Sequence, residues 1–193
     1  MKRTGTLLLA LFLGMCFASH CEATVYNSDG SAANVQALNN TAQDGDTITL
    51  PSGTFTWATG VTITKIITLQ GQGTGTGGGD QTVIIDNYAS GQPLLNFQVG
   101  SSGVFRMTGI TVQSGTGSIK DNGTINIAGP GNVRIDHCHL NVTSSANYKP
   151  LAIYNGVFGV LDHCIVDFTS GGAFLAMSSS AAMQGSLKTT KCW

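Results

Sequence analysis

The chain has 193 residues, which is enough for one domain with a hydrophobic core. Its net charge of −1 argues against electrostatic capture of nucleic acid or of acidic membrane surfaces. Only 10% of the residues are charged and 26 are glycine, a composition that disfavours long helices and favours short strands joined by turns.

The N-terminal segment has the pattern of a secretion signal. Lys2 and Arg3 are followed by an apolar run over residues 7–17, which is too short to span a bilayer. Small residues then lead to Ala23. We therefore expect residues 1–23 to be removed on export, a secreted (extracellular or periplasmic) location, and no stable membrane insertion.

One helix is predicted after the signal. Val35, Leu38 and Ala42 recur at the spacing of one helical face, and Asp29 or Ser31 can cap its start. After this helix the apolar period changes to two. Short apolar runs broken by Gly, Pro, Asn or Ser follow, and each predicts a strand of three to six residues.

An internal repeat decides how these strands are arranged. The tripeptide Asp-His-Cys begins at Asp136 and again at Asp162, 26 residues later. Arg106 and Arg134 form a weaker pair 28 residues apart. A period in the mid-twenties, with three short strands per period, predicts a parallel β-helix whose coils lie about 4.8 Å apart.

Parity places a corner at the repeated tripeptide. If Ile135 points inward, strict alternation sends Leu140 outward, because the step between them is odd. The same odd step separates Leu161 from Val166. Since all four are apolar, we expect the chain to bend within each Asp-His-Cys segment.

Two passages, "VQALNNTAQDGDTITLPSGTFTW" and "NVRIDHCHL", carry a resemblance to a known family. The first resembles the N-terminal cap and first coil of the pectate-lyase-like right-handed parallel β-helix proteins. The second is similar to their Trp-Ile-Asp-His segment, with Arg134 in place of Trp. The resemblance covers residues 31–175. It implies a right-handed parallel β-helix with a short N-terminal capping helix, and it assigns no catalytic role to the Ile-Asp-His segment.

The expected organisation has four parts: signal 1–23, N-terminal cap 24–45, about five coils over 46–177, and an irregular tail over 178–193. The tail offers no recognisable closing cap. We therefore expect a truncated or frameshifted product, with self-association through the open end of the last coil.

Asp136 and Asp162 are the first candidates for chemistry, because stacked carboxylates repel unless a cation intervenes. They could bind calcium, act as a catalytic acid and nucleophile, or be solvated corner residues beside Arg134. In lyases of the resembled family an arginine or lysine base acts near calcium, so Arg106 and Arg134 are also weak catalytic candidates.

The histidines and cysteines of the repeat allow a zinc site, but stacked rows do not readily give tetrahedral geometry, which favours ladders of identical side chains. A disulfide between Cys138 and Cys164 stays open. The glycine-rich passage over residues 71–80 is expected to be a turn rather than a phosphate cradle, because a strand follows it. Tyr88 and Tyr148 lie in predicted loops and are candidates for contact with sugars.

The sequence thus predicts a secreted β-helix that binds or processes extracellular acidic polysaccharide. If the protein is an enzyme, a polysaccharide lyase or a glycoside hydrolase is expected. The alternative is a non-catalytic, adhesin-like scaffold, which includes an inactive fragment. Fold does not choose between them.

Overall fold

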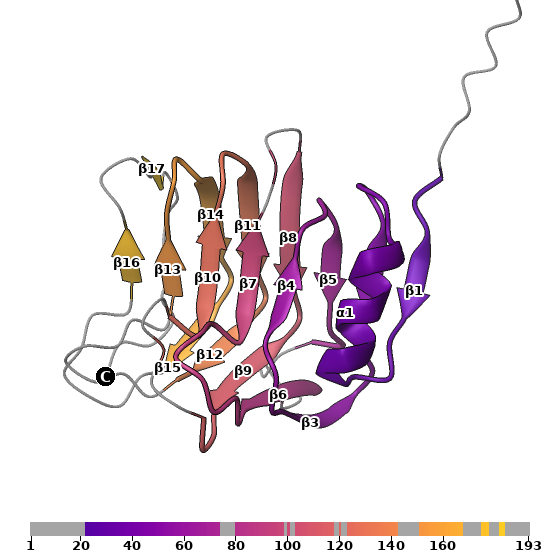
Figure 1. The fold of residues 1–193 in the computed structure, drawn as a ribbon, viewed down its shortest axis with the longest axis vertical. Coiled ribbons are helices and arrows are strands. Elements are labelled where there is room, and N and C mark those ends of the chain that lie inside the picture. Colours follow the sequence, from indigo (N-terminus) through magenta and orange to yellow (C-terminus); the bar gives the residue numbers. More distant parts are fainter. Residues whose placement is uncertain are drawn as a thin grey trace, which may run out of the picture.

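The computed structural model describes residues 22–73, 80–98, 100, 103–117, 120, 123–142 and 151–167, and the backbone of 175–177 and 182–183. This part of the chain contains one α-helix and three parallel sheets. The strands advance from the helix at one end to β16 (Leu175–Met177) at the other (Figure 1). The prediction of an all-β parallel β-helix with a short capping helix is confirmed.

Successive strands of each sheet are, with one exception, three strands apart in the chain, as expected for a solenoid with three strands per coil. Sheet A has the order β1 (Val25–Asn27), β2 (Thr47–Thr49), β5 (Thr68–Gln70), β8 (Val104–Thr108), β11 (Asn132–Asp136), β14 (Phe158–Asp162), β17 (Ala182–Met183). Sheet B has the order β3 (Gly53–Trp57), β6 (Thr82–Asp86), β9 (Thr111–Ser114), β12 (His139–Asn141), β15 (Ile165–Asp167). Sheet C has the order β4 (Val61–Ile63), β7 (Leu95–Gln98), β10 (Ile125–Ala128), β13 (Leu151–Ile153), β16.

The core consists of rows of apolar side chains that run across the strands. One row in sheet A contains Ile48, Leu69, Met107, Ile135 and Leu161, which are in register on neighbouring strands and buried. A residue on one coil therefore packs on its equivalent in the next coil. Burial of alternate residues in short strands is what the period of two predicts.

The helix α1 (Ala32–Thr41) covers the first coil. Ser31 caps its start and accepts a hydrogen bond from the backbone of Asn34 at 3.2 Å, which confirms one of the two predicted caps. Its side chains also reach the solenoid, because Gln36 and Asn39 both donate to the carbonyl of Thr62. Through these contacts the helix closes one end of the core.

Several strands were not expected from the sequence. In β1, β3 and β5 threonine, glycine or polar residues weaken the apolar alternation, and parallel pairing to neighbouring coils defines the strands instead. The short strand β17 lies inside the segment that was expected to be irregular, and pairs with β14. Tertiary pairing thus overrides weak local preference.

The aromatic residues of β3 pack against the N-terminal cap, with Trp57 buried and Phe55 partly buried. Trp57 is 1% exposed, and its indole nitrogen donates to the carbonyl of Gly30 at 2.9 Å. Phe55 packs against Gly30 as well, where a Cβ atom would lie 2.1 Å from the ring. Because Gly30 also has a φ of +87°, any other residue there would be strained and would clash. These two aromatics fix the cap on the first coil.

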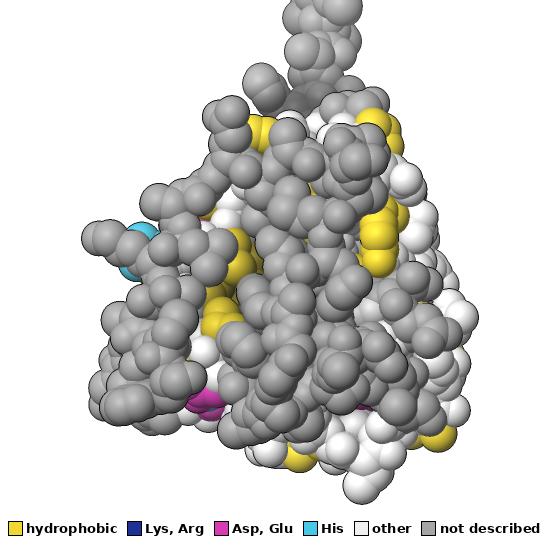
Figure 2. All heavy atoms as spheres, turned by 90° about the vertical axis from the view of Figure 1, so that its left-hand side faces the viewer, with side chains coloured by type: hydrophobic (Ala, Val, Ile, Leu, Met, Phe, Trp, Pro, Cys, Tyr) yellow, Lys and Arg dark blue, Asp and Glu magenta, His cyan; other side chains and the backbone are white. Residues whose placement is uncertain are grey.

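The opposite end of the solenoid is the one expected to self-associate. Figure 2 views this end, where hydrophobic side chains of described residues reach the surface. Self-association remains a prediction, because it would require the last coil to pair with a strand of a second chain.

Candidate functional site

The two Asp-His-Cys segments form equivalent corners between sheet A and sheet B. Asp136 and Asp162 are in register at the ends of β11 and β14. The next residues, His137 and His163, both have a φ of +52°, in the left-handed region that few residues other than glycine adopt. This single left-handed residue turns the chain and shifts the parity, so Leu140 is buried as predicted.

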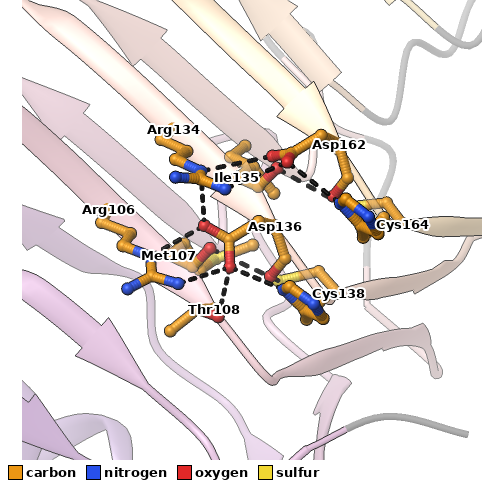
Figure 3. A network of polar contacts seen from close by, with 11 residues as sticks. Arg106, Met107, Thr108, Arg134, Ile135, Asp136, Cys138, Asp162 and Cys164 are labelled. Carbon is orange, nitrogen blue, oxygen red and sulfur yellow. Dashed lines mark hydrogen bonds and ion pairs between the residues drawn. The ribbon is translucent and has the colours of Figure 1, made fainter. Parts of the chain in front are cut away.

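Asp136 is the centre of the site, and its side chain is fully buried. Arg106 donates to it from two nitrogens, Nε at 2.7 Å and Nη2 at 2.8 Å. Thr108 Oγ1 donates at 2.6 Å, and Nδ1 of His137 lies 2.9 Å away. Arg134 Nε lies 2.9 Å from the same carboxylate. Figure 3 shows this network, in which two guanidinium groups cover one carboxylate.

Arg134 also reaches the next coil. Its Nε and Nη2 atoms donate to Asp162 at 3.3 and 3.0 Å, so one guanidinium bridges the two aspartates. Asp162 is 21% exposed and lies 3.1 Å from Nδ1 of His163. We call the set Arg106, Asp136, Arg134 and Asp162 the Arg–Asp ladder. The sequence predicted the stacking and the nearby Arg134, but solvated carboxylates were the wrong expectation for Asp136.

The ladder changes the acidity of both carboxyls. Burial raises the pKa of Asp136, but hydrogen bonds from Arg106, Thr108 and His137 outweigh it and hold that pKa well below its ordinary value. For Asp162, burial likewise opposes the hydrogen bonds from Arg134 and His163, which lower its pKa. Both aspartates are therefore ionised at neutral pH, and neither is suited to donate a proton as a general acid.

The arginines are exposed on the side away from the aspartates. Arg106 and Arg134 are in register on β8 and β11, and their side chains are 42% and 44% exposed. The printed contacts of both guanidinium groups with the aspartates are made through Nε and Nη2. The hydrogen bond to Asp136 raises the pKa of Arg106, so its charge is permanent. Two fixed cations thus face solvent from neighbouring coils.

The two histidines stack beside the ladder. Their ring centres are 5.0 Å apart with planes 4° from parallel, and the side chains are 57% and 66% exposed. The cysteines that follow, Cys138 and Cys164, are buried and free. Each thiol lies within hydrogen-bonding distance of two backbone carbonyls, and burial raises the pKa of Cys138. This is the arrangement of side-chain ladders, and the two thiols are not joined in a disulfide.

Calcium would need oxygen ligands that are not already in use. The oxygens of Asp136 accept hydrogen bonds from Arg106 and Thr108, and Arg134 forms an ion pair with the same carboxylate. A cation held by both aspartates would therefore have to displace Arg134. Among the described residues, no three histidine, cysteine, aspartate or glutamate side chains are grouped so as to hold a metal ion. The calcium hypothesis stays a prediction for experiment.

The tyrosine candidates lie elsewhere. Tyr88 is half-buried, and Nζ of the buried Lys120 lies 4.7 Å from its ring centre. The same amine donates to the carbonyls of Tyr88 and Ser90, and lies 3.4 Å from the carboxylate of Asp86. This cluster holds two loops together and reduces the ring surface that a sugar could contact. Tyr148 and most of the glycine-rich passage lie outside the described residues.

One polar cluster gave no signal in the sequence. The ring nitrogens of His139 lie 2.9 Å from Asp80 and 3.0 Å from Asp167, on the outward face of sheet B. The three residues are far apart in the chain, and only the coil register brings them together. A carboxylate at each nitrogen favours a clamp between coils rather than a proton-transfer role for this histidine.

Comparison with known proteins found no matching family model, no matching curated protein and no matching solved structure. No helix in the described part of the chain is long and apolar enough to cross a membrane. The functional argument therefore rests on the chemistry of the ladder.

Proposed function

We propose that this protein is exported and binds acidic polysaccharide through the Arg–Asp ladder on the outward face of sheet A. One observation carries the proposal: Arg106 and Arg134 lie in register and are held by the aspartates, yet their side chains are 42% and 44% exposed. The export signal expected at residues 1–23 supports a ligand found outside the cell.

Physical chemistry favours a polyanion as the ligand. A guanidinium fork matches the geometry of a carboxylate, and a side chain already fixed by a salt bridge loses less entropy on binding. Cations repeated at the coil spacing of about 4.8 Å can engage successive acidic sugars of one polymer.

The ladder supports binding better than cleavage by paired carboxylates. A retaining glycosidase needs one protonated carboxyl, whereas Asp136 and Asp162 both have lowered pKa values. Cleavage by a lyase is tested separately, because it would produce an unsaturated sugar that absorbs ultraviolet light. We expect no such rise in absorbance when polygalacturonate is incubated with the protein.

The test is the affinity of the mature chain for polygalacturonate, measured at low and high salt. The informative variant is R106Q/D136N/R134Q/D162N, which removes the ladder without changing the net charge or leaving a buried carboxylate without its cations. We expect at least a tenfold loss of affinity and a weaker salt dependence than wild type has.

K65Q tests whether any positive charge matters: it removes one positive charge outside the ladder and should bind like wild type. Carboxyl-reduced polymer should bind neither protein. Equal affinity of the fourfold variant and wild type would show that the ladder is only structural.

A further inference from the structure

Exposed hydrophobic side chains gather on the same sheet face as the ladder. Among the described residues, three large hydrophobic side chains are exposed: Val25, Val104 and Phe158, at 58%, 53% and 45%. All three point outward from sheet A, on β1, β8 and β14. Single exposed apolar residues are ordinary, but Val104 and Phe158 lie on β8 and β14, on or next to the strands that carry the arginines, which points to a binding surface.

Phe158 is the aromatic one of these three side chains, and it lies near the arginines. It is in register with Asn132 on β11, and Arg134 lies two residues further along that strand. Alternate residues on a strand are about 7 Å apart and share one face, so Phe158, Asn132 and Arg134 form an outward triangle. Arg106 continues the line onto β8, because it is in register with Arg134.

We infer that Phe158 is a stacking platform for one sugar ring of the acidic polymer, whose carboxylates then reach Arg134 and Arg106. This inference rests on the proposed function and adds a second recognition element to it. An aromatic ring packs against the apolar face of a pyranose, and the exposed amide of Asn132 is placed to meet a hydroxyl. The polymer accordingly crosses β14, β11 and β8, along the solenoid axis.

The two elements recognise different chemistry, which makes them separable. The arginines attract any polyanion, whereas Phe158 contributes only when the polyanion carries sugar rings. Poly-glutamate, which has carboxylates but no pyranose, should therefore bind through the arginines without help from Phe158. Polygalacturonate should use both.

The experiment compares wild type, F158L and F158Y for affinity to polygalacturonate and to poly-glutamate. Leucine keeps an apolar side chain without the ring, and tyrosine keeps the ring. We expect F158L to bind polygalacturonate about 2- to 10-fold more weakly, with poly-glutamate unchanged and F158Y close to wild type. V25A is the control for an exposed apolar residue at the far end of the sheet, and should bind both polymers normally.

Three results would overturn the inference. If F158L binds polygalacturonate as wild type does, while the fourfold ladder variant does not bind, the stacking platform is wrong and the proposed function stands. Equal losses for both polymers would mean that Phe158 acts on the arginines rather than on sugar. If wild type binds neither polymer, the proposed function fails together with the inference.

Discussion

The two Asp-His-Cys corners have the same backbone and different chemistry. His137 and His163 have the same φ, and each aspartate contacts the histidine that follows it, at 2.9 and 3.1 Å. Yet the side chain of Asp136 is fully buried and lies against two arginines, whereas that of Asp162 is 21% exposed and contacts one. The fold repeats the corner without repeating its environment.

The difference arises from neighbours rather than from the tripeptide itself. Two residues before the aspartate, β11 carries Arg134 where β14 carries Val160. On the preceding strand, the position in register with Asp136 is Thr108, which donates a hydrogen bond, whereas Asp162 has the carboxylate of Asp136 there. In a solenoid, a residue's chemistry is therefore decided by the adjacent coils.

The largest contrast is expected from removing each carboxylate in turn. D136N leaves two arginines facing a neutral amide and should lower the free energy of unfolding by about 2–3 kcal/mol. D162N removes a partly exposed pair and should cost less than about 1 kcal/mol. Urea unfolding of both variants measures the difference. Equal losses, or the gain in stability that relief of simple repulsion would give to D136N, would contradict the assigned environments.

Acid should lower the free energy of unfolding, because it protonates both aspartates and removes their ion pairs. Both aspartates have folded-state pKa values below the ordinary 3.8, so their stabilisation is complete well above that pH. It is lost as the pH falls below 3.8 and through the lower folded-state values. Unfolding measured between about pH 2 and 6 should show a steeper loss for wild type than for D136N/D162N. Parallel pH curves would mean that neither carboxyl contributes.

A gain-of-function change should make the second corner resemble the first. V160R places an arginine two residues before Asp162 on β14. This is the position that Arg134 has relative to Asp136 on β11. We expect tighter binding of polygalacturonate with a steeper salt dependence, and at most about 0.5 kcal/mol of added stability. V160Q is the neutral control of similar length. Binding that V160R does not improve over V160Q would argue against an additive row of cations.

Calcium should have the smallest effect. A cation shared by Asp136 and Asp162 would have to displace Arg134, so we expect melting temperatures in calcium and in chelator to agree. A calcium-dependent rise in wild type that is lost in D136N would instead establish the site that the sequence suggested, with the arginine moved aside.

Much of the fold could be predicted because the spacing of a sequence repeat determines which residues lie in register on neighbouring coils. The 26-residue spacing gave the register of Asp136 with Asp162, and the odd step from Ile135 to Leu140 gave the corner. The left-handed histidine that produces this corner was not predicted, since only a few per cent of residues other than glycine adopt that conformation, even though histidine is enriched among them.

The site was only partly predictable for a different reason. The sequence predicted that Arg106, Arg134 and the aspartates lie on neighbouring coils. It did not predict the burial of Asp136, because that burial depends on side chains from two other strands. The contact of His139 with Asp80 and Asp167 depends on the register of three coils. Such long-range contacts leave no local pattern.

The most direct test of the account is to locate the bound polymer by NMR. Oligogalacturonate is titrated into the isotopically labelled mature chain, and shifts of backbone amides and arginine Nε–H groups are followed. The account predicts the largest changes on β8, β11 and β14, at Arg106, Arg134 and Phe158, with sheets B and C little affected. Changes centred on sheet C or sheet B, or no saturable change, would contradict the assignment of sheet A as the binding face.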